Sequence, residues 1–126
     1  MTEAAKPQRT VVVLADDLIW ATRLSEAVRK AGAAPRNVRR VEDLDALLRD
    51  GAGMNLGVIV DLTARAYDGV AAIRLASAAG AKVVAVGQHD DVALRRAATE
   101  AGAARVFTYR ALFEDGTRLL ERWLAG

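Results

Sequence analysis

The chain contains no cysteine and one histidine, His89, among its 126 residues. Disulfides, thiol nucleophiles and thiolate metal sites are therefore excluded, and one histidine leaves little room for a zinc site or a Ser-His-Asp triad. No apolar run approaches the length of a membrane span, and no signal peptide precedes the first apolar segment. The length suits a single domain, so we expect one cytoplasmic domain with no membrane contact.

Neither sign of charge dominates the sequence. It has 18 basic and 16 acidic residues, giving a formal net charge of +2, although the calculated pI is about 9.4. Because the basic residues are interleaved with acidic ones, we expect no nucleic-acid binding. No G-x-G-x-x-G or Walker A segment is present, which argues against the usual nucleotide binders. No nucleophile and general base can be paired, so we expect no enzymatic activity.

Short apolar runs and helical patterns alternate five times. The runs predict strands at 10–15, 36–41, 57–60, 82–86 and 105–108, and the patterns predict helices at 17–31, 42–49, 69–79, 91–101 and 114–125. This repeat implies an α/β fold, a parallel sheet with helices on both faces. The second strand is the weakest, and its Arg36, Arg39 and Arg40 suit a sheet edge. Residues 1–9 are expected to be a disordered tail before one domain over 10–126.

Acidic residues end two of the predicted strands. Asp16 and Asp17 follow the first strand, and Asp61 follows the third. Ligands bind at the carboxyl ends of strands in open α/β sheets, and carboxylates gathered there repel one another unless a cation lies between them. A hard ion such as Mg²⁺ fits that role. The alternative is that these residues cap a helix and a loop.

Three segments, VVVLADD, VIVDLTARAYDG and VVAVGQHDDVALRRAATEAGA, give the chain a family resemblance. In their order and spacing they resemble the receiver domain of bacterial two-component response regulators, from the first strand to the C-terminus. The resemblance implies a flavodoxin-like (βα)5 doubly wound sheet with strand order 2-1-3-4-5. It also implies that Asp61 is the phosphoacceptor, that Asp17 holds Mg²⁺ with Asp16 assisting, and that the Thr63 carbonyl completes the metal shell.

Two positions depart from the family pattern. Receivers carry Thr or Ser where this chain has Gly87, and a Lys where an ungapped alignment places Tyr109. A shift of one residue would place Arg110 there, with Phe107 as the switching aromatic. A charge-assisted hydrogen bond contributes about 1.5–3 kcal/mol, and a full population shift needs roughly 5.5 kcal/mol, so the two losses predict an impaired switch.

Three functions follow from these patterns. The first is a stand-alone pseudo-receiver in a two-component or phosphorelay pathway, acting through protein–protein contacts with degenerate or atypical phosphorylation at Asp61. The second is a working response regulator, phosphorylated on Asp61 by a histidine kinase with Mg²⁺, in which Arg110 replaces the Lys. The third is a small-molecule or nucleotide binder on the same fold.

The expected partner is a protein in trans, a kinase or an output protein, because no output domain follows residue 126. Leu18 and Ile19 are candidate interface residues, whereas Trp20 is assigned to the core stripe of the first helix. In receivers, the fourth helix, fifth strand and fifth helix commonly form the partner or dimer face, so a homodimer through them is a further form of contact. The candidates there are Arg95, Arg96, Arg105, Tyr109, Arg118 and Arg122.

Overall fold

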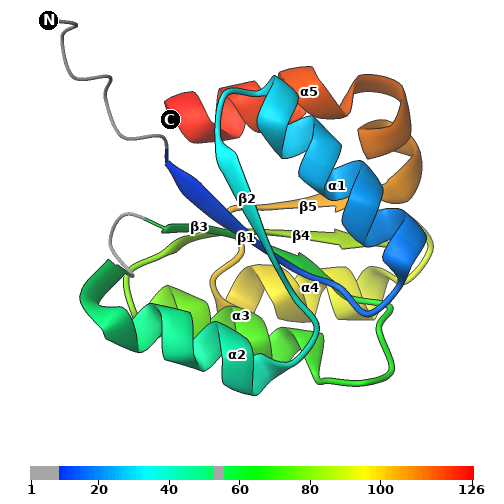
Figure 1. Cartoon of the computed structure of the whole chain (residues 1–126). Helices are drawn as coiled ribbons and strands as arrows, with labels where there is room; N and C mark the ends of the chain where they lie inside the picture. Colours follow the sequence, from blue (N-terminus) through cyan, green and yellow to red (C-terminus); the bar gives the residue numbers. More distant parts are fainter. Residues whose placement is uncertain (1–8, 53–55) are drawn as a thin grey trace, which may run out of the picture.

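The computed structural model describes residues 9–52 and 56–126, and in this part of the chain five parallel strands form one sheet (Figure 1). The strands are β1 (Thr10–Leu14), β2 (Ala34–Val38), β3 (Leu56–Asp61), β4 (Lys82–Gly87) and β5 (Arg105–Thr108). Their order is β2-β1-β3-β4-β5. The predicted flavodoxin-like fold and its 2-1-3-4-5 order are confirmed, as is the place of β2 at the sheet edge.

Helices cover both faces of the sheet (Figure 1). They are α1 (Leu18–Lys30), α2 (Val41–Leu47), α3 (Gly69–Ala78), α4 (Val92–Ala101) and α5 (Tyr109–Ala125), with a π-helical segment η1 (Leu48–Ala52) after α2. Helices α1 and α5 lie on one face, and α2, α3 and α4 lie on the other. None of the described helices is both long and apolar enough to span a membrane.

The core is divided into two clusters by the sheet. Val11 and Val13 of β1 pack toward α1 and α5, whereas Val12 and Leu14 pack toward α2 and α3. All four side chains are fully buried. A strand covered on both faces needs a continuous apolar run instead of an alternating one, which is the pattern that the sequence shows.

Two element boundaries differ from the prediction by three residues or more. The second strand was expected at 36–41 but ends at Val38, because Val41 already begins α2. The fifth helix was expected from residue 114 but begins at Tyr109. A kink at Asp115 (φ −146°, ψ 30°) divides α5 into two pieces, and the first piece is too short to show helical periodicity.

Arg9, the first residue that the structure describes, is hydrogen-bonded to two parts of the domain. The carbonyl of Arg9 accepts the Ala34 N–H at 2.9 Å, and its guanidinium donates to the Leu124 carbonyl at 3.3 Å. Arg9 is thus attached to both an edge strand and the last helix. The remainder of the predicted tail, residues 1–8, lies outside the described residues.

Candidate functional site

An open pocket of about 530 Å³ lies at the carboxyl ends of the strands. Strands β1 and β3 are neighbours with Leu14 opposite Val60, so the acids that follow them end at the same edge of the sheet. All three predicted acids line the pocket. The complete lining is Asp16, Asp17, Trp20, Asp61, Thr63, Arg65, Gln88 and Tyr109.

Asp61 is buried, with 1% of its surface exposed, and its Oδ1 atom accepts several hydrogen bonds. The Thr63 N–H donates to it at 3.0 Å and the Thr63 hydroxyl at 2.9 Å. The Tyr109 hydroxyl donates to the same oxygen and also contacts the Thr63 hydroxyl. Thr63 and Tyr109 have one hydroxyl proton each, so when both protons are directed at Asp61 the contact between the two hydroxyl oxygens is not a hydrogen bond.

The Tyr109 hydroxyl reaches Asp61, and the neighbouring Arg110 does not. The Arg110 side chain is 85% exposed and pairs with Glu114 at 3.5 Å. Burial, followed by the hydrogen bond to Asp61, raises the pKa of Tyr109 well above its ordinary value. A neutral phenol therefore stands beside Asp61, at the position where the resemblance expects an ammonium group.

Asp16 and Asp17 are engaged in local structure. Asp17 Oδ1 accepts the N–H groups of Ile19 at 2.8 Å and Trp20 at 3.1 Å, which caps the start of α1. Asp16 Oδ2 accepts the N–H groups of Arg65 at 3.2 Å and of the following residue at 3.3 Å, which holds the loop between β3 and α3. The capping alternative therefore describes Asp17 in this structure.

The predicted divalent ion stays a prediction for this pocket. Within the described residues, no group of three or more His, Cys, Asp or Glu side chains could hold a metal ion. In each of Asp16, Asp17 and Asp61, one carboxylate oxygen accepts hydrogen bonds from N–H or O–H groups of the protein. The three acids share a pocket, and we derive no step through a metal.

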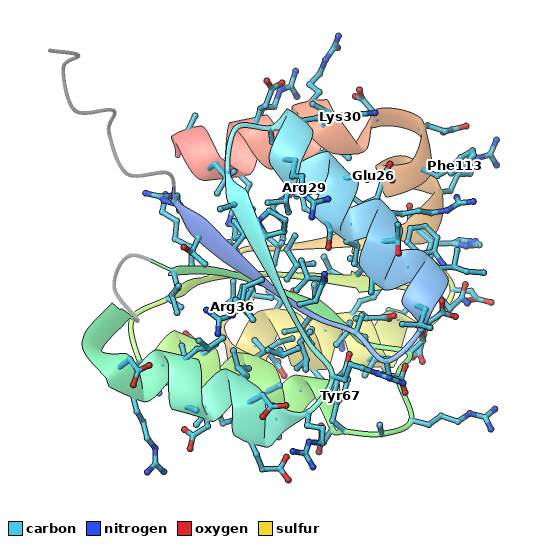
Figure 2. All side chains as sticks on the ribbon, viewed as in Figure 1. Glu26, Arg29, Lys30, Arg36, Tyr67 and Phe113 are labelled. Atoms are coloured by element: carbon cyan, nitrogen blue, oxygen red, sulfur yellow. The ribbon has the colours of Figure 1, made fainter. Side chains whose placement is uncertain are left out.

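Tyr67 is a site residue that the sequence did not reveal (Figure 2). Its hydroxyl lies 2.9 Å from the Leu14 carbonyl oxygen and 2.7 Å from the Asp61 carbonyl oxygen. Burial, followed by the charges of Asp61 and Asp16, raises its pKa well above the ordinary value. Tyr67 therefore links the ends of β1 and β3 as a neutral donor. Its position at the end of the loop from Asp61, directly before Asp68, was the available signal.

The space beside Gly87 is filled by Leu62. A Cβ atom at position 87 would lie 3.3 Å from Leu62 Cδ1 and 3.6 Å from Leu62 Cβ. Leu62 also packs on Gly69, where a Cβ would lie 3.1 Å from its Cδ2 atom. Gly87 thus lacks the hydroxyl that receivers carry at this position, and Leu62 packs closely in the space beside it. Phe107 is 5% exposed and belongs to the core cluster under α1 and α5.

The predicted interface residues lie on two separate faces. Leu18 and Ile19 are 68% and 65% exposed at the start of α1, and Trp20 is half-buried between the core cluster and the pocket. The arginines Arg95, Arg96 and Arg105 line a shallow groove between α4 and β5. On α5, Arg118 lies 3.9 Å from Asp115 and Arg122 is exposed.

Solved structures with the same fold are numerous. No protein-family model matches the chain. A search of curated proteins also finds no match. A response regulator from Thermotoga maritima superposes with a TM-score of 0.78 at 17% identity, covering 94% of this chain and 99% of that one. The BeF3-activated DrrB receiver domain superposes with a TM-score of 0.75 at 20% identity, covering 94% of this chain and 99% of that one.

A third neighbour is a response regulator from Burkholderia pseudomallei with a phosphorylated aspartic acid and a calcium ion. It gives a TM-score of 0.68 at 17% identity, covering 93% of this chain and 73% of that one. The chain thus has the fold of receiver domains over nearly its whole length, in agreement with the resemblance of its sequence.

Proposed function

We propose that this chain is a pseudo-receiver, a signalling module of a two-component-type pathway that works by protein contact with Asp61 held in one state. The observation that carries the proposal is the bonding of Asp61, whose Oδ1 atom is occupied by the Tyr109 hydroxyl and by both donors of Thr63. These groups give the carboxylate a complete set of partners on that oxygen. The proposal assigns the module no catalytic activity of its own.

Charge argues against ordinary phosphorylation of Asp61. A phosphoryl group adds about 1.5 to 2 negative charges at neutral pH. The pocket already contains three acids, and Arg65 is the one basic residue among the described residues that line it. The neutral Tyr109 hydroxyl cannot offset the added charge, and Gly87 offers no hydroxyl to a phosphoryl oxygen.

Related folds offer a contrast. The Burkholderia pseudomallei neighbour is described with a phosphorylated aspartic acid and a calcium ion, and the DrrB domain as activated by BeF3. If this chain behaved in the same way, phosphorylation would have to displace the Tyr109 hydroxyl from Asp61 and to assemble ligands for a cation. A hydrogen bond to a charged group contributes about 1.5–3 kcal/mol, so the displacement opposes the reaction by roughly a factor of 10 to 100.

The partner we propose is a protein in trans, either a kinase or an output protein. Two exposed surfaces support contact. The start of α1 carries Leu18 and Ile19, and the groove between α4 and β5 is lined by arginines that belong to none of the ion pairs among the described residues. A homodimer through α4, β5 and α5 is included in the proposal as one form of contact.

The test is exposure of the intact protein to acetyl phosphate, and separately to beryllofluoride, with Mg²⁺. We expect no mass gain at Asp61 and unchanged amide NMR spectra around Asp17, Asp61 and Gly87. A Tyr109→Lys variant, which supplies an ammonium group, is the matched comparison and is expected to respond more than the wild type. A mass gain in the wild type that is lost in Asp61→Asn would overturn the proposal and establish a working phosphoacceptor.

A further inference from the structure

The groove between α4 and β5 is rich in arginine and runs along the outer edge of the sheet. Its volume is about 390 Å³. One wall is a stripe of α4 at helical spacing, Val92, Arg95, Arg96 and Thr99, and the other wall is the chain from 104 to 106. Three arginines line the groove, and no acidic side chain does so among the described residues. The groove therefore carries positive charge without a compensating group.

The three arginines have hydrogen-bonding capacity to spare. None of them belongs to an ion pair in the described part of the chain. Arg95 donates from Nη1 to the His89 carbonyl at 3.3 Å, and its Nε atom is enclosed without a hydrogen-bond partner. The Arg105 guanidinium lies 5.5 Å from the Phe107 ring centroid, and Arg96 is exposed. A carboxylate is the strongest partner for such cationic donors, so the groove is suited to an acidic ligand.

The backbone of β5 has a free side at the same edge. Strand β5 is the last of the sheet, with β4 on one side and no strand on the other in the described part of the chain. The Ala104 N–H donates to the Val83 carbonyl at 2.8 Å, toward β4. Because successive residues of a strand direct their N–H and C=O groups to opposite sides, those of Arg105 and Phe107 point away from β4. Such a row of open donors and acceptors is a template for an added strand.

The opposite edge of the sheet, at β2, is a poorer template. The Ala34 N–H and the Val38 carbonyl bond to the β1 side, so Pro35 and Asn37 carry the groups that point outward. Proline has no N–H to donate, and it is a common means of blocking an edge strand. Strand β5 contains no proline, and its exposed charge, Arg105, repels basic strands only. The β5 edge is therefore open to a segment of opposite charge.

We propose that an extended, acidic segment of a partner protein binds this groove, adding a strand to the free edge of β5 and directing carboxylates to Arg95, Arg96 and Arg105. The inference deepens the proposed function, on which it rests, by giving the chemistry of the partner in trans. Main-chain hydrogen bonds to Arg105 and Phe107 supply general affinity, and the arginines supply selectivity for acidic sequences. A second copy of the chain is a poor occupant, because two β5 edges side by side would bring like charges together.

The probe is an octapeptide of alternating glutamate and valine, titrated into the intact protein and followed by amide NMR. We expect Arg96→Gln combined with Arg105→Gln to weaken binding roughly 10-fold, because two exposed ion pairs are lost together. Both arginines are exposed, so this double variant should fold as the wild type does. The matched control is Arg29→Gln combined with Arg36→Gln, which removes the same charge from exposed positions on α1 and β2 (Figure 2) and should leave the affinity nearly unchanged.

Hydrogen exchange tests the added strand separately. Saturating peptide should slow exchange of the Arg105 and Phe107 amides several-fold and leave the Val106 amide, already directed at β4, unchanged. Absence of binding, binding without this alternating pattern, or equal weakening in the two double variants would overturn the inference. Equally tight binding of a lysine–valine octapeptide or a single-stranded oligonucleotide would also overturn it. Phosphate uptake at Asp61 would overturn only the locked site and leave the peptide results unaffected, so the two failures are distinguishable.

Discussion

Replacement of Tyr109 by phenylalanine removes one oxygen atom from the pocket and leaves the ring in place against Trp20. The lost hydrogen bond ends on a carboxylate, and such bonds contribute about 1.5–3 kcal/mol. Asp61 keeps the Thr63 N–H and hydroxyl, so it is not left without partners. Tyr109 is also only partly buried, which weakens the bond through solvent screening. We therefore expect the free energy of unfolding to fall by about 1–2 kcal/mol.

Urea denaturation at pH 7 measures this loss, which should appear at an unchanged m value. The coupling follows from a double-mutant cycle with Asp61→Asn, in which we expect an interaction energy of about 1 kcal/mol. Tyr67→Phe is the matched control, because it also removes one phenol hydroxyl but one bonded to backbone carbonyls. An interaction energy near zero for Tyr109, or the same value for Tyr67, would refute the idea that the phenol stabilises the carboxylate.

Three further predictions concern the surroundings of the pocket. The unfolded chain ionises its two tyrosines near pH 10, whereas the raised pKa of both groups keeps them protonated in the folded state. The free energy of unfolding should therefore keep its full value below about pH 10 and fall above it by up to about 1.4 kcal/mol per pH unit for each tyrosine. Urea denaturation between pH 9 and 11.5 measures this slope, and an unchanged slope in Tyr67→Phe would contradict the assignment. Gly87→Ser should lower the free energy of unfolding by about 1 kcal/mol, because the new Cβ would lie 3.3 Å from Leu62 Cδ1. Adding Leu62→Val should recover part of that loss. If thermal denaturation shows that the effects of the two substitutions simply add, the packing argument is wrong. Substitution of the helix caps Asp68 and Asp91 by alanine should each lower the free energy of unfolding by roughly 1 kcal/mol. Asp17→Ala should lower it by less, because it also relieves repulsion from Asp16 and Asp61. Melting temperatures in the reverse order would disprove this.

The sheet could be predicted because its three central strands, β1, β3 and β4, are buried on both faces. Continuous β-branched runs such as Val11–Val13 are typical of strands that are covered on both faces. The shared edge for Asp16, Asp17 and Asp61 followed from the same strands and their parallel order. Local pattern was less informative where the elements were short, which explains the late start assigned to α5.

The details of the site depended on side-chain direction, which spacing along the sequence does not determine. Tyr109 and Arg110 are adjacent, so a one-residue choice decided whether a phenol or a guanidinium met Asp61. Tyr67 escaped notice because a loop tyrosine has no periodic pattern to mark it. Leu62 shows the same limit, because its packing on Gly69 and Gly87 joins residues from three different segments.

The bond between Tyr109 and Asp61 is made by an uncharged donor, and this has a consequence for its dependence on salt. Ionic strength screens a partly buried hydrogen bond far less than it screens exposed charges. The stability that this bond contributes should therefore change little between low and high salt, unlike that of an exposed ion pair such as Arg110 and Glu114.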